Sequence, residues 1–138
     1  MSDARMAAVE LFIDSWNHRK IEPVLEITSD DFEYVNPPNA VEPGVRRGSE
    51  GIRHVMQAQW DALGEDARLE IDRIYPPEGD QLIAQGIVSR GMPGSDARVE
   101  NRIVLGWTFE EARLIRLEVL GAGSSYHDAL AKAGLSEA

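Results

Sequence analysis

Apolar residues in the first half of the chain recur at intervals of three and four positions, and this spacing predicts helices. Between residues 3 and 17 they form one stripe, made up of Met6, Val9, Phe12, Ile13 and Trp16. A short second helix is expected from Glu22 to about residue 28, since Pro23 suits a first helical turn. A third helix is expected at residues 49–63 and should end at Gly64.

Apolar and polar residues alternate along most of the second half, and this period of two predicts strands. The expected strands lie at residues 31–36, 67–75, 82–91, 97–109 and 112–120, and a last helix is expected at 125–133. Strand 97–109 alternates most clearly, with an apolar face running from Val99 to Phe109 and a charged face opposite. Helices followed by an antiparallel meander predict an α+β fold, with the sheet wrapped over the helices.

Three polar residues stand on strand faces that are otherwise apolar. Tyr34 and Asn36 share the face of Phe32, just before a loop that begins with two prolines, and Asn101 interrupts the apolar face of strand 97–109. A buried amide without a partner costs about 1–3 kcal/mol, so Asn101 needs Gln85, a water molecule or a ligand. Tyr34 and Asn36 either line a pocket or make hydrogen bonds at the strand end, where Asn36 would cap the turn.

Composition narrows the classes of function. The 138 residues suit a single domain over 1–138, and no apolar run is long enough for a membrane helix. A formal charge of −10 opposes binding to nucleic acid or to an anionic membrane surface. The chain has no cysteine, its three histidines show no metal spacing, and we expect neither a metal nor a cofactor. The start of the chain lacks an apolar secretion segment, which predicts a cytoplasmic protein.

The order of these elements, together with several short motifs, resembles the nuclear transport factor 2-like superfamily. The motifs are Trp16-Asn17, the run from Asp31 to Pro37, Gly48, and the run from Gly106 to Phe109. This superfamily includes ketosteroid isomerases, SnoaL-like polyketide cyclases and limonene epoxide hydrolases. The resemblance implies a cone-shaped, curved antiparallel sheet wrapped over helices, a cystatin-like α+β barrel with an apolar cavity at its wide end. It also implies a homodimer.

The catalytic patterns of two members fit this sequence poorly. The ketosteroid isomerase pattern needs a tyrosine, an aspartate base and a protonated acid. These positions fall on Phe12, Asn36 and Leu105, which supply neither the base nor the oxyanion donors.

The limonene epoxide hydrolase pattern fits at one place, where Tyr34 and Asn36 precede proline as in that family's water-holding motif. Its Asp-Arg-Asp set, however, falls on Gln85, Ile87 and Val119. A water molecule held by Tyr34 and Asn36 would then have no carboxylate to take its proton.

We therefore predict a protein that binds a small, neutral, hydrophobic molecule such as a terpenoid, steroid or polyketide. Hydrogen bonds from Tyr34, Asn36 and Asn101 would orient this ligand. The apolar walls of the pocket would be Phe12, Trp16, Leu105, Trp107, Leu117 and Val119. Two alternatives stay open. One is a SnoaL-like cyclase, isomerase or epoxide hydrolase that uses Tyr34 and Asn36 to position substrate or water, and the other is a structural dimerisation module.

Overall fold

The computed structural model describes residues 4–38, 40, 42–92, 94–123 and 126–134. Its helices are α1 (Ala4–Asn17), α2 (Glu22–Ile27), α3 (Gly48–Leu63) and α4 (Tyr126–Lys132). Its strands are β1 (Thr28–Asn36), β2 (Gly44–Arg47), β3 (Arg68–Ile74), β4 (Gln81–Gly91), β5 (Arg98–Glu110) and β6 (Arg113–Ala122). The predicted α+β class is confirmed, and none of the helices in this part of the chain is long and apolar enough to cross a membrane.

The strands form one curved sheet in the order β2-β1-β6-β5-β4-β3. The neighbouring strands pair antiparallel except β1 and β6, which run parallel, so the prediction of a wholly antiparallel sheet was wrong at this pair. The sequence shows strands and their faces but not which strands become neighbours, and here the first long strand joins the last. The sheet stays open, because β2 and β3 lie at opposite edges.

Strand β2 was missed by the sequence analysis, which predicted only a loop between Pro37 and the third helix. All four of its residues are exposed, so no apolar alternation marks it. It pairs with the end of β1, where Gly44 lies opposite Asn36. The short strand therefore covers one edge of β1 next to two of the predicted polar residues, Tyr34 and Asn36.

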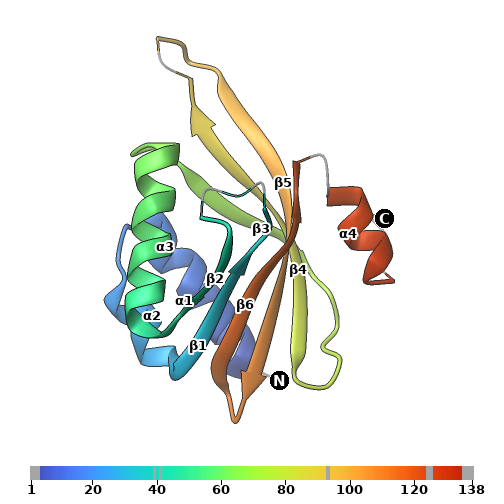
Figure 1. Ribbon diagram of the computed structural model, residues 1–138. Coiled ribbons are helices and arrows are strands. Elements are labelled where there is room, and N and C mark those ends of the chain that lie inside the picture. Colours follow the sequence, from blue (N-terminus) through green and yellow to red (C-terminus); the bar gives the residue numbers. More distant parts are fainter. Residues whose placement is uncertain (1–3, 39, 41, 93, 124–125, 135–138) are drawn as a thin grey trace.

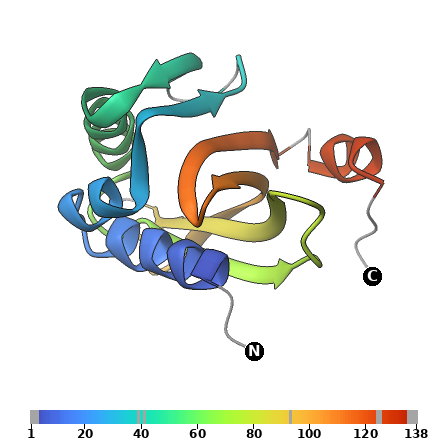
Figure 2. The ribbon, with the colours of Figure 1, turned by 90° about the horizontal axis from the view of Figure 1, so that it is seen from below.

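Helices α1, α2 and α3 lie on one side of the sheet, and α4 lies on the other (Figures 1 and 2). The inner face of the sheet packs against α1 through aromatic rings. Phe12 meets Trp107 edge-on, with 5.2 Å between the ring centroids, and Tyr34 at 6.3 Å. Phe12, Trp107 and Tyr34 are all buried, so this contact closes one end of the space between helices and sheet.

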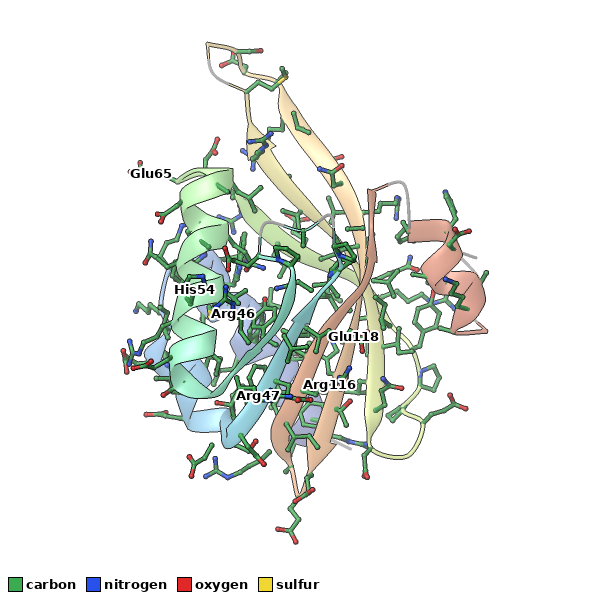
Figure 3. All side chains as sticks on the ribbon, viewed as in Figure 1. Arg46, Arg47, His54, Glu65, Arg116 and Glu118 are labelled. Carbon is green, nitrogen blue, oxygen red and sulfur yellow. The ribbon has the colours of Figure 1, made fainter. Side chains whose placement is uncertain are left out.

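The outer face of the sheet divides into an apolar part and a charged part. Tyr126, Ala129 and Leu130 of α4 form a second buried cluster with Val104 and Tyr75. Beyond α4, ion pairs link the exposed sides of β2, β1 and β6 (Figure 3): Arg47 and Arg116 both pair with Glu33, and Arg116 also pairs with Glu118. Glu33 and Glu118 thus lie on the outer face of the sheet, away from Tyr34.

The close approach of β3 and β4 depends on a glycine. A Cβ atom added at Gly86 would collide with the backbone carbonyl oxygen of Glu70, and the pairing of the two strands shifts register immediately beyond, between Ile71 and Arg73. Gly86 thus permits the bend that carries β3 toward α1.

We predict that Gly86→Ala lowers the free energy of unfolding by about 1–3 kcal/mol, because backbone must move to accommodate the methyl group. Denaturant unfolding would measure the change. Gly106→Ala on the adjacent strand is the matched control, since its Cβ would meet only the ends of the Leu120 and Gln81 side chains. Equal losses in the two variants would contradict this account of the bend.

Candidate functional site

A cavity of about 360 Å³ lies between α1, α3 and the inner face of the sheet. Its walls come from elements far apart in the sequence, and most of them are apolar. The lining residues are Phe12, Trp16, Tyr34, Asn36, Ala40, Gln59, Leu63, Leu69, Val88, Asn101, Ile103, Leu105, Leu117, Val119, Ala122 and Gly123. All of the predicted pocket residues except Trp107 are among them.

Trp107 lies behind the cavity wall. It is fully buried, and two residues that do line the cavity shield it: Phe12 packs on its ring, and Leu117 is its cross-strand partner on β6. The alternation of β5 correctly placed Trp107 on the inner face. It could not show that the space on that face is already filled at this depth, so the prediction of Trp107 as a wall was wrong.

Asn36 is the polar residue with the least satisfied side chain in the cavity. Its side chain is buried, with 5% of the residue exposed, and it lines the cavity at the end of β1. Neither Oδ1 nor Nδ2 has a hydrogen-bond partner among the described residues. The sequence left open whether Asn36 caps a turn or faces a pocket, and the structure places it in the pocket wall.

Gln59 of α3 joins Asn36 as a second amide in the cavity wall. Trp16 donates its indole N–H to Gln59 Oε1 at 2.9 Å, and the Tyr34 hydroxyl donates to the same oxygen at 3.5 Å. Because an indole nitrogen can only donate, the accepting atom must be the amide oxygen. The Nε2 group, for which no described residue is an acceptor, is thereby left as the donor that Gln59 can offer a ligand.

The sequence analysis did not single out Gln59 as a site residue, although a signal was present. Gln59 is the polar member of the stripe that also carries Ile52, Val55, Met56 and Trp60. A polar residue on the core face of a helix needs a partner, just as Asn101 does on its strand. The same reasoning applied to both elements would have found Gln59.

Tyr34 keeps its proton over the whole physiological range. Burial raises the pKa of its hydroxyl from 10.0 to about 12. The hydroxyl can therefore donate a hydrogen bond or accept one, and its phenolate form is strongly disfavoured.

Asn101 lies at the rim of the cavity and is exposed, opposite Val88 on β4. Gln85, considered as its partner, faces the other side of the sheet, where its Oε1 accepts a hydrogen bond from Tyr75 at 2.7 Å. Water at the rim can satisfy the Asn101 amide, so this residue carries no burial penalty.

The residues of β4 that face the cavity also exclude the alignment with the limonene epoxide hydrolase pattern. Gln85 and Ile87 pair with Val104 and Arg102 on the outer side, so neither faces the cavity. A slip of one residue brings Ala84, Gly86 or Val88 inside, and none of them has an acidic or basic side chain. Tyr34 is the titratable group among the described cavity-lining residues.

His54 lies outside the cavity, on the exposed side of α3 (Figure 3). Its Nε2 is 2.6 Å from Glu42 Oε1, which also accepts a hydrogen bond from Arg46 at 2.9 Å. The hydrogen bond from His54 is the largest influence that lowers the pKa of Glu42. This pair ties the chain before β2 to α3.

The raised pKa of Tyr34 makes folding stability depend on alkaline pH. The unfolded state loses this proton near pH 10 and the folded state near pH 12, so the stability that Tyr34 contributes is present below pH 10 and declines above it. From about pH 9 to about pH 11, wild type should lose about 1 kcal/mol more than Tyr34→Phe. Urea unfolding at each pH measures this difference, and parallel losses would contradict the burial of the hydroxyl.

The unpartnered amide of Asn36 predicts a stabilising substitution. Asn36→Leu, which has nearly the same shape, should raise the free energy of unfolding of the ligand-free protein by about 1 kcal/mol or more. Gln57→Leu on the exposed face of α3 is the control for replacing an amide with leucine. A loss of stability in Asn36→Leu, with the control unchanged, would show that the Asn36 amide has partners.

No curated protein sequence matches the chain. Among solved structures, TerC co-crystallised with polyporic acid has 19% sequence identity and a TM-score of 0.73, over 85% of this chain and 90% of that chain. An NTF2-like protein of unknown function from Burkholderia pseudomallei has 17% identity and a TM-score of 0.72, over 86% and 90% of the two chains.

A third solved structure, a putative SnoaL-like polyketide cyclase from Jannaschia, has 14% identity and a TM-score of 0.66, over 84% of this chain and 83% of that chain. At these identities the similarity shows the fold alone. The sequence model of the SnoaL-like domain matches residues 9–117, a segment that runs from α1 into β6 and includes most of the cavity wall. The chain therefore belongs to the SnoaL-like domain family, within the nuclear transport factor 2-like superfamily.

Proposed function

We propose that this protein binds a small, neutral, hydrophobic molecule in the cavity between α1, α3 and the sheet. The observation that carries the proposal is the side chain of Asn36, buried in the cavity wall with both polar atoms unpartnered among the described residues. A folded protein that keeps such a group forgoes about 1–3 kcal/mol unless a bound molecule supplies the hydrogen bonds.

The size and chemistry of the cavity support a ligand of this kind. Its volume of about 360 Å³ falls within the range of small-molecule sites. The described walls are mostly aliphatic and aromatic, with no carboxylate, lysine, arginine or histidine among them. Terpenoids, steroids and polyketide-like aromatics combine an apolar body with few polar groups, and TerC, which shares the fold, was crystallised with polyporic acid.

We prefer binding to catalysis because the described cavity wall offers no group to move a proton. An amide cannot act as a base near neutral pH, and the pKa of Tyr34, about 12, keeps its hydroxyl protonated. The enzyme alternative would use Asn36, Gln59 and Tyr34 to orient a substrate or a water molecule. It would be revealed by turnover of a ligand found in the experiment below. The homodimer and the cytoplasmic location stay predictions.

Thermal unfolding against a panel of steroids, terpenoids, epoxides and aromatic polyketides would test the proposal. A ligand present at 100 times its dissociation constant should stabilise the native protein by about 2.7 kcal/mol. Val119→Phe places a ring in the cavity and should abolish this stabilisation.

Val35→Phe is the matched control, because Val35 lies opposite Val45 and Glu118 on the charged outer face. It should leave the stabilisation by the ligand intact. The proposal fails if no compound stabilises the wild type. It also fails if Val119→Phe responds to the ligand as strongly as Val35→Phe does.

A further inference from the structure

The two unpartnered atoms of Asn36 differ in what they require. Nδ2 carries two protons to donate, and Oδ1 has lone pairs that only accept. Both atoms are buried, and both lack partners among the described residues. A ligand that satisfies one of them and not the other leaves a buried polar atom unpaired, which binding assays register as lost affinity.

Other polar groups of the cavity do not impose the same demand. Gln59 Oε1 is already occupied by Trp16 and Tyr34, so Gln59 offers a ligand its Nε2 donor alone. Asn101 is exposed at the rim, where water competes for its amide. Asn36 is thus the described wall residue at which a ligand must supply a donor and an acceptor together.

We propose, building on the binding function above, that the ligand carries a hydrogen-bond donor directly beside a carbonyl oxygen on one edge. Such an edge occurs in a lactam or a primary carboxamide. It would pair with the Asn36 amide through two hydrogen bonds, from Nδ2 to the carbonyl oxygen and from the N–H of the ligand to Oδ1. The apolar remainder of the ligand would lie against Phe12, Leu105 and Leu117.

The cavity selects this edge over the simpler alternatives. A ketone or a lactone satisfies Nδ2 but faces Oδ1 with another acceptor or with nothing. A carboxylate brings only acceptors, and its charge would be buried among walls whose described residues include no cation. A hydrocarbon satisfies neither atom. The preferred ligand is therefore neutral and matches both.

Three fused bicyclic probes of nearly equal shape separate these cases. Carbostyril, the lactam of the quinoline ring, presents N–H beside C=O. Coumarin replaces the N–H with a ring oxygen, and naphthalene has no polar atom. Titration of each probe into the purified protein, followed by tryptophan fluorescence and by calorimetry, gives the three dissociation constants. We expect carbostyril to bind at least about tenfold more tightly than coumarin.

Variants assign this preference to its residue. Asn36→Leu should reduce the ratio of the coumarin and carbostyril dissociation constants to about one and should bind naphthalene at least as tightly as wild type does. Gln57→Leu, which removes an amide from the exposed face of α3, should keep the wild-type ratio. Melting temperatures of both variants establish that they fold.

The outcomes separate this inference from the binding function on which it rests. If wild type binds all three probes with similar affinity, the cavity binds hydrophobic molecules, and the inference that its ligand carries a paired donor and acceptor is wrong. If carbostyril is preferred equally by wild type and Asn36→Leu, the preference does not come from Asn36 and the inference is overturned. If none of the probes binds, the inference is overturned, and the thermal-unfolding panel above decides separately whether the binding function stands.

Discussion

The contact between Phe12 and Trp107 determines which part of the space between α1 and the sheet is filled by side chains and which part remains a cavity. One ring comes from the first helix and the other from the longest strand, and they meet edge-on at 5.2 Å within a buried cluster. Such contacts bury large apolar areas, so they hold α1 against the sheet. Besides Phe12, the cavity wall consists mostly of aliphatic side chains, with the amides of Asn36, Gln59 and Asn101 among them. The cavity is the space that this aromatic contact leaves unfilled.

The polar groups of the cavity differ in how many of their hydrogen bonds are formed within the protein. This difference distinguishes the groups that stabilise the wall from the group that we propose binds a ligand. Trp16 and Tyr34 both donate hydrogen bonds to the amide oxygen of Gln59. These bonds link three elements, fix the orientation of the Gln59 amide and add rigidity to the wall. In contrast, both polar atoms of the buried Asn36 side chain lack a hydrogen-bond partner among the described residues. A buried group in such a state lowers stability, and sites that bind ligands commonly retain groups of this kind because the ligand completes them.

The sequence predicted the classes of the long elements and half of the residues in the described cavity wall, because both follow from periodicity. The inward positions of β5 and β6, including Leu105, Leu117 and Val119, lie in the wall as predicted. Three features could not be read in this way. Strand β2 has no apolar face, the parallel pairing of β1 with β6 depends on the path of the whole chain, and the burial of Trp107 behind Phe12 depends on depth along the cone.

The position of Asn36 on its strand allows its amide to be compared with a catalytic group of the ketosteroid isomerase pattern. In the ketosteroid isomerase pattern this place on the strand carries the base, a carboxylate that faces the reacting carbon. An amide has nearly the same shape, stays neutral at every physiological pH, and offers both a donor and an acceptor where the carboxylate offers only acceptors. The exchange removes a group that could accept a proton and, under the binding function proposed above, retains directional hydrogen bonds to the polar end of a ligand. The amide at this position therefore fits the binding function proposed above, in which the two polar atoms of Asn36 would set the specificity for the ligand.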